Sequence, residues 1–185
     1  MRSVEIIVLG NVSSDHLDAV SMSISEYLGF KTALRGFIAL GATDKRVLAY
    51  RILDSIPNDN ENIKLVITDY DIYHPGYNFL FGLALPKSKK AVVSLYRLRS
   101  DDFCLELERI IKESIHELGH ILGLNHCWTP RCVMNFSNTI WEVDEKNTRF
   151  CNKCKQTLET NGIQINSEFD HWSVIRKVLR GRKCL

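Results

Sequence analysis

Three histidines and a glutamate in one short stretch could hold a catalytic metal ion. His116 and His120 are four residues apart, so on a helix their side chains project from the same face. Two such imidazoles can bind one tetrahedral zinc, and Glu117 beside them can act as a base toward its water. Gly123 permits the positive φ that ends a helix, so the turn after it can return His126 as a third ligand. A fourth position stays open for water, as in catalytic zinc sites.

The same residues also have a simpler explanation. A His-Glu-x-x-His sequence arises by chance, and helical histidines are often ordinary core or surface residues. The chain has six histidines and ten glycines in 185 residues, so the full pattern His-Glu-x-x-His-x-x-Gly-x-x-His is a rare arrangement of them. Extended patterns of this kind are followed by a methionine in metzincins. Met134 lies eight residues after His126 and suits that position, although alone it could be an ordinary core residue.

Four cysteines begin directly after His126. Their spacing is C-x4-C-x18-C-x2-C, which is typical of a structural zinc site. The alternative is two disulfides or four unrelated thiols. Nothing in the sequence indicates an oxidising compartment, so we expect the six cysteines to be reduced or metal-bound. Cys104 lies away from both motifs and reads as a core thiol. The expected ligands of the structural zinc are Cys127, Cys132, Cys151 and Cys154.

These motifs together resemble the archaemetzincins. The resemblance is carried by HELGHILGLNHCWTPRCVMNFS and the later FCNKC, with VSLYRL at 93–98, KESIHELGH at 112–120 and PGYNFLFGLAL at 75–85. It implies a metzincin-like zinc metalloprotease with a second zinc bound by the four cysteines. It also implies that the strand near 77–85 is an antiparallel edge strand above the catalytic zinc, against which an extended peptide can pair. Some metzincins have a tyrosine two residues after the methionine, where this chain has Phe136.

The elements that must position these residues follow from hydrophobic periodicity. Alternating strands and helices up to about residue 68 predict a mainly parallel sheet with helical crossovers. We expect an α/β fold: a single compact metzincin-like domain with a mixed, mostly parallel sheet, an antiparallel edge strand, an active-site helix and C-terminal helices. The expected strands are 4–9, 30–40, 63–68, 77–85 and 91–98. The expected helices start at Ser14 or Asp15, Thr43 or Asp44, Asp101 or Asp102 and Glu168 or Asp170, with a short one within 144–160.

The remaining expectations concern single residues and partition of the chain. Residues 1–122 should form the sheet and active-site helix, and 123–185 the Met-turn, the four-cysteine zinc site and the C-terminal helix. Gly82 suggests a bulge or a close approach by another backbone. His16 reads as a solvated surface residue, His74 as structural, and Trp172 as part of the core face of the last helix.

Composition excludes several classes of function. The net charge of +2 gives no strong electrostatic reason to bind nucleic acid or a membrane. No apolar run approaches the roughly 20 residues that cross a bilayer. No secretory signal is recognisable at the N-terminus. We therefore expect a cytoplasmic monomer that takes a peptide or protein substrate.

The favoured function is zinc-dependent peptide hydrolysis, with two zinc ions per chain, one catalytic and one structural. In this interpretation Glu117 is the general base toward a zinc-bound water. One alternative is a non-catalytic binding module stabilised by zinc, which would have no use for Glu117. Another is hydrolysis of a different amide by the same chemistry, which the sequence does not separate from peptide hydrolysis.

Overall fold

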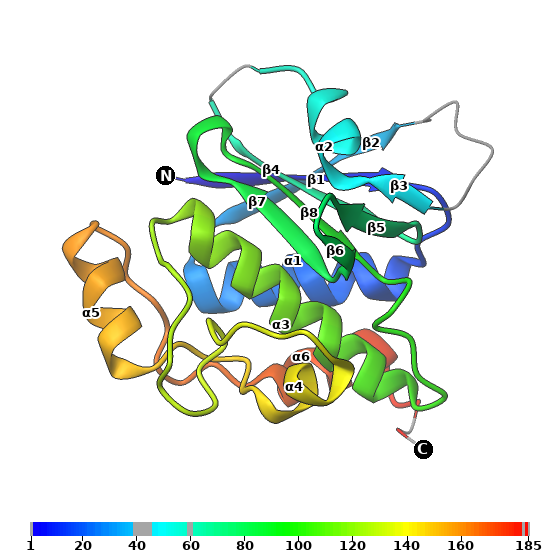
Figure 1. Ribbon diagram of the computed structural model, residues 1–185. Helices are drawn as coiled ribbons and strands as arrows, with labels where there is room; N and C mark the ends of the chain where they lie inside the picture. The colour runs from blue at the N-terminus through cyan, green and yellow to red at the C-terminus, as the bar shows by residue number, and fades with distance from the viewer. Residues whose placement is uncertain (1, 39–45, 59–60, 183, 185) are drawn as a thin grey trace.

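A five-stranded sheet runs through the centre of the computed structural model, which describes residues 2–38, 46–58, 61–182 and 184 (Figure 1). The strands lie in the order β2-β1-β4-β8-β7. Neighbouring strands are parallel except β7, which runs antiparallel to β8 at one edge. The expected mostly parallel sheet with an antiparallel edge strand is confirmed. The bounds are β1 Ser3–Leu9, β2 Lys31–Ile38, β4 Ile63–Thr68, β7 Gly82–Leu85 and β8 Lys90–Ser94.

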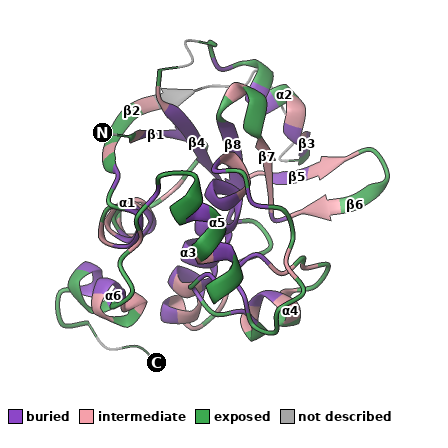
Figure 2. Ribbon diagram, turned by 90° about the vertical axis from the view of Figure 1, so that its left-hand side faces the viewer, coloured by how far each residue is buried: buried purple, intermediate pink, exposed green. Residues whose placement is uncertain are grey.

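The central strands are buried on both faces, as Figure 2 shows for β1, β4 and β8. Their side chains alternate between two hydrophobic clusters. In β4, Leu65 and Ile67 belong to one cluster, and Val66 between them belongs to the other. In β8, Val93 and Val92 divide in the same way. This double burial explains why these strands are nearly continuous apolar runs in the sequence.

Helices cover both faces of the sheet (Figure 1). The short α2 (Ala49–Asp54) lies on one face, and α1 (Ser14–Leu28) and α3 (Phe103–Ile121) lie on the other. Helix α3 packs against β8 and β7. The histidine motif in α3 therefore lies beneath the antiparallel edge of the sheet, which is the arrangement that the family resemblance implied.

A second sheet of three strands includes a projecting hairpin formed by its last two strands. The sheet consists of β3 (Arg46–Leu48), β5 (Asp71–His74) and β6 (Tyr77–Leu80), and Figure 2 shows β5 and β6 extending away from the main sheet. The single strand expected at 77–85 is therefore two strands, because the chain leaves one sheet and enters the other at Phe81. The Arg97 guanidinium donates to both carboxylate oxygens of Asp71, at 2.8 and 2.9 Å, and so holds the hairpin against the chain that follows β8.

The chain after α3 contains three short helices, α4 (Ile140–Glu145), α5 (Asn152–Thr160) and α6 (His171–Leu179). Tyr27 of α1 joins this part to the first: its hydroxyl accepts a hydrogen bond from the Phe150 amide at 2.8 Å, and its ring stacks on Phe150 and Phe169. One hydrophobic cluster contains residues from β1 through α6. The two expected parts of the chain therefore share a core.

Three expectations about single residues were wrong. Cys104 is not a thiol but forms a disulfide with Cys184, because the C-terminal tail returns to the first turn of α3. His16 is buried, since its Nε2 bonds to a Glu106 carboxylate oxygen at 2.7 Å. Trp172 is 40 % exposed, and the neighbouring apolar positions of α6 fill the core instead.

The observed helices and strands differ from the expected ones more in their boundaries than in their type. The strand expected at 91–98 is β8 and ends at Ser94. The helix expected from Thr43 or Asp44 falls partly outside the described residues, and α2 begins at Ala49. The long helix and the last helix begin as expected, capped by the side chains of Asp102 and Asp170. Among the described residues, no helix is both long and apolar enough to span a membrane.

Candidate active site and metal centres

Helix α3 brings the first two histidines and the glutamate to one place. The Asp102 carboxylate accepts hydrogen bonds from the amides of Cys104 and Leu105, which fixes the start of the helix. The helix ends where Gly123 adopts φ 97°, a conformation that glycine tolerates best. The chain can then turn back, and His126 reaches the other two histidines. Its ring centroid lies 5.4 Å from that of His116 and 4.8 Å from that of His120.

The orientations of the first two imidazoles fit a shared cation. The Nδ1 atom of His116 bonds to the Val133 carbonyl oxygen, and that of His120 to the Leu124 carbonyl oxygen, both at 2.8 Å. A carbonyl only accepts, so each Nδ1 carries the proton and each Nε2 is left with a lone pair. The two Nε2 atoms lie 3.1 Å apart. Two lone pairs so close repel unless a cation lies between them, and zinc is bound by neutral imidazoles.

Burial keeps these imidazoles in the form that binds metal. It lowers the pKa of His116 well below its usual value, with a further contribution from the positive charge of Lys146. Burial also lowers the pKa of His120, and partial burial of the ring lowers that of the more exposed His126. Ligand atoms of the three histidines lie within 4.8 Å of one another. The donor set therefore fits one zinc ion.

Glu117 occupies a position that only glycine on the neighbouring strand permits. A Cβ placed on Gly82 of β7 would lie 2.5 Å from Glu117 Oε1 and 2.7 Å from its Cγ. The close approach expected at Gly82 is therefore by this side chain, not by another backbone. Burial raises the pKa of Glu117 well above its usual range, and the Glu113 carboxylate one turn earlier raises it further. A carboxyl group so tuned can take up and release a proton.

Met134 lies beneath the histidines, as a Met-turn residue should. It is fully buried, and a Cβ on Gly119 would lie 2.4 Å from its sulfur, so the methionine packs directly on α3 between the two helical ligands. Phe136, two residues later, places its ring 4.9 Å from that of His126. Phe136 stands where some metzincins have a tyrosine. Its ring packs against the third histidine and offers no hydroxyl.

A cleft of about 920 Å³ opens over this cluster. One wall comes from β6, β7 and the residue between them, with Tyr77, Phe79 and Phe81, and the floor includes Glu117 of α3. Phe136 and the two residues after it also line the cleft. Strand β7 pairs with β8 on one side and is the last strand of its sheet, so its outer edge faces an extended chain placed in the cleft.

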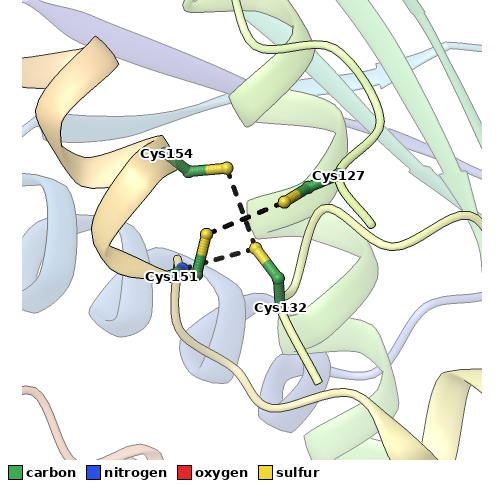
Figure 3. Close-up of side chains that lie close together, drawn as sticks. All are labelled: Cys127, Cys132, Cys151 and Cys154. Carbon is green, nitrogen blue, oxygen red and sulfur yellow. Dashed lines mark hydrogen bonds between the residues drawn. The ribbon is translucent and has the colours of Figure 1, made fainter. Parts of the chain in front are cut away.

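The four cysteines form a second, separate cluster, with their sulfurs pointing toward one another (Figure 3). The sulfurs of Cys127 and Cys151 are 3.7 Å apart, and those of Cys132 and Cys154 are 3.8 Å apart. Sulfurs bound tetrahedrally at about 2.3 Å from one zinc lie about 3.8 Å from each other. The cluster therefore has the dimensions of a Cys₄ zinc site and not of two disulfides, in which sulfurs are about 2.05 Å apart.

Burial and hydrogen bonds also shift the pKa values of three of the four cysteines. Burial raises the pKa of Cys132 to about 11 and that of Cys154 still further. At Cys151 burial acts in the same direction, but hydrogen bonds from the Cys154 amide and neighbouring groups outweigh it and bring the pKa to about 6. Thiols with raised pKa values become thiolates together only when a metal ion replaces their protons.

The two clusters are joined through the backbone. Val133 lies between Cys132 and Met134, and its carbonyl is the group that orients His116. Cys127 directly follows His126, and its amide donates to the Met134 carbonyl at 2.9 Å. A metal bound by the cysteines would therefore hold in place the turn on which the histidine cluster rests.

Other candidate residues lie outside both clusters. His74 contacts the rings of Tyr50 and Tyr77 at the edge of the cleft, which agrees with a structural role. Sequence reasoning missed the buried pair formed by Glu113 and Lys146, whose Nζ and Oε1 atoms are 2.6 Å apart. The one available signal was the placement of Glu113 one helical turn before Glu117.

Comparisons with known proteins agree with this geometry. The model of the family described as Peptidase family M54 matches residues 47–160. An archaemetzincin of Pyrococcus abyssi is 37 % identical over 87 % of this chain and 96 % of its own length. One of Pyrococcus horikoshii is 49 % identical over 60 % of this chain, and that match spans 62 % of the relative's length. The chain belongs to peptidase family M54.

The solved structures give the same result for the fold of this M54 chain. The crystal structure of archaemetzincin from Methanopyrus kandleri matches with a TM-score of 0.75 and 34 % identity, and the match covers 86 % of this chain and 95 % of that one. The resemblance to archaemetzincins and the metzincin-like fold are thus confirmed. By its family the chain is a zinc metallopeptidase.

Proposed function

We propose that this chain hydrolyses peptide bonds with a zinc ion held by His116, His120 and His126, and with Glu117 as the general base. The observation that carries the proposal is the pair of Nε2 atoms 3.1 Å apart, each on an imidazole whose Nδ1 is already bonded to a carbonyl. When bound, zinc supplies a Lewis acid for the scissile carbonyl and brings the pKa of a water toward about 7.

The protein's own groups would carry the proton. Glu117 accepts a proton from the attacking water at a carboxylate oxygen and passes it to the nitrogen of the leaving amine. Its raised pKa supports both steps, because a more basic carboxylate takes the proton more readily and holds it until the amine departs. Gly82 keeps the carboxylate against β7, close to where a bound backbone would run.

The substrate would bind as an additional strand. Within the described part of the chain, no strand pairs with the outer edge of β7 along the cleft, so its amides and carbonyls can pair with an extended peptide. Aromatic side chains of the same wall would contact apolar substrate residues. A folded protein offers such a segment only in a loop or a terminus, so peptides and exposed protein segments are the proposed substrates.

A second, structural zinc is proposed for Cys127, Cys132, Cys151 and Cys154, which gives two zinc ions per chain. Its support is the spacing of the sulfurs, close to the edge of a tetrahedron around zinc. The cytoplasmic, monomeric state expected from the sequence stays a prediction. The disulfide between Cys104 and Cys184 weighs against a strongly reducing compartment.

The function is tested with Glu117→Gln, which keeps the shape of the side chain and removes the base. Zinc content and the thermal melt should match those of the native protein, while hydrolysis of a cleaved peptide falls by about 10²–10⁴. Equal rates for the two proteins would contradict the assignment of the base. Native, zinc-loaded protein that binds peptides and cleaves none would instead favour the non-catalytic module.

A further inference from the structure

Glu113 is a second carboxylate in the cleft, and the chemistry proposed above does not use it. It lies on α3 one turn before Glu117, so both side chains project from the same face of the helix. Glu113 is only 3 % exposed, yet it lines the cleft. A carboxylate is retained in a buried position only where partners compensate the loss of water.

The partner of Glu113 stands behind it and leaves the cleft free. Lys146 Nζ bonds to Glu113 Oε1 at 2.6 Å, and Lys146 is itself buried and does not line the cleft. Its position is fixed because Arg109 of α3 binds both oxygens of Asp144, two residues earlier, at 2.7 Å. A carboxylate has about four acceptor positions on two oxygens, so one lysine does not exhaust Glu113.

The described charged residues that line the cleft are acidic. Among the described residues that line it, Glu113 and Glu117 are acidic, and none is a lysine or an arginine. Ser137 also lines the cleft, and its buried hydroxyl has no hydrogen-bond partner. A substrate side chain that enters here therefore meets hydrogen-bond acceptors, and the fixed cation beside them, Lys146, does not line the cleft.

We propose that Glu113 is a specificity-determining residue that selects a cationic side chain, lysine or arginine, next to the scissile bond. The ammonium or guanidinium group shares the Glu113 carboxylate with Lys146. The inference rests on the proposed peptide hydrolysis. It follows that this enzyme prefers basic segments of proteins, although aromatic residues also line its cleft.

The test compares peptides that differ in one residue, lysine or norleucine, placed in turn on each side of the scissile bond. Norleucine keeps the length of the lysine stem and lacks its charge. Zinc-loaded native protein should hydrolyse the best lysine peptide about 10–100-fold more efficiently than its norleucine counterpart, in kcat/KM. The double variant Glu113→Gln/Lys146→Met removes both charges together, so it avoids an unpaired buried ion and should fold. Its ratio should fall to about 1.

A single substitution should change the preference for lysine in the opposite direction. Lys146→Met leaves the substrate cation as the main partner of Glu113, so the preference for lysine should rise above the native ratio. If this variant fails to fold, the double variant still decides. A lysine-to-norleucine ratio that is the same in the native protein and the double variant would overturn the role of Glu113, with peptide hydrolysis itself intact.

Binding separates this inference from the proposed function. Fluorescence anisotropy of the same labelled peptides is measured with zinc-loaded Glu117→Gln protein, with and without the two charge changes. Tighter binding of the lysine peptide that disappears in the charge-neutral variant supports the role of Glu113, even if native protein hydrolyses nothing. Equal binding of both peptides by all variants overturns it.

Discussion

At the scale of single residues, Gly82 determines where Glu117, the proposed general base, lies. Gly82→Ala would place a Cβ within 3 Å of three atoms of Glu117, so the whole side chain must move. Small displacements of a catalytic group are costly, and kcat should fall about 10–100-fold with KM and zinc content little changed. Steady-state kinetics and metal analysis check this.

A double-mutant cycle gives the control for this prediction. Glu117→Asp shortens the side chain and withdraws it from β7. In that background Gly82→Ala should cost clearly less than it does in the native protein, because the clash is relieved. Equal, additive losses would show that Gly82 acts on something other than Glu117.

At the scale of elements, the buried contact between His16 of α1 and Glu106 of α3 makes the stability of the fold depend on pH. Burial alone would raise the pKa of Glu106, but hydrogen bonds from His16 and the Ser100 amide outweigh it, and the net shift is downward. A carboxyl group with a lowered pKa stabilises the fold above its unfolded pKa. That stability is lost as the pH falls through the folded pKa.

Glu106→Gln should therefore lower the melting temperature at pH 7 by an amount equivalent to about 1–3 kcal/mol. The difference from the native protein should shrink as the pH falls below about 4, where the native carboxyl also becomes protonated. Thermal melts from pH 3 to pH 8 measure it. A difference that stays constant over this range would mean that the ionised Glu106 carboxylate is not what joins the two helices.

The four-cysteine cluster fixes the segment after α3. Cys154→Ser should destabilise the protein more than His126→Ala does, because a metal bound by the four cysteines would tie α5 to the turn that carries Val133 and Met134. His126 is exposed, and its loss removes a ligand without releasing any element of the fold. Thermal melts of the two variants decide, and a smaller loss for the cysteine variant would contradict a structural site.

At the scale of the whole molecule, the features that could be predicted from the sequence are those that local residue patterns encode. The residues His116, His120 and His126 come together because helical periodicity and one glycine turn suffice to place them. The same holds for strands β1, β4 and β8, whose double burial leaves continuous apolar runs. The edge position of β7 came from the family resemblance and not from any periodicity.

What sequence reasoning missed are contacts between distant side chains. Cys104 and Cys184 are 80 residues apart, and His16 and Glu106 are 90 apart. No helical or strand period relates such pairs, so His16 was expected on the surface from the usual exposure of histidine, and Cys104 was expected to be a thiol because it lies away from both motifs. The break at Phe81 was missed for another reason, because both strands on either side of it are apolar and read as one.

The disulfide can be tested directly by counting free thiols. After zinc is removed and the protein is unfolded without reductant, titration should find four free thiols, those of the zinc cluster, while Cys104 and Cys184 stay paired. After reduction it should find six. Six thiols without reductant would restore the original expectation that all cysteines are reduced or metal-bound.

The central claim is that one chain holds two metals in separate, adjacent sites. His126 and Cys127 are consecutive, with Cα atoms about 3.8 Å apart, so metals bound to each should lie within roughly 14 Å. Anomalous diffraction at the zinc absorption edge from crystals of the zinc-loaded protein measures this directly. We expect two peaks, one among the Nε2 atoms of the three histidines and one among the four sulfurs. A single metal bound by a mixture of these histidines and cysteines, or two metals much farther apart, would contradict it.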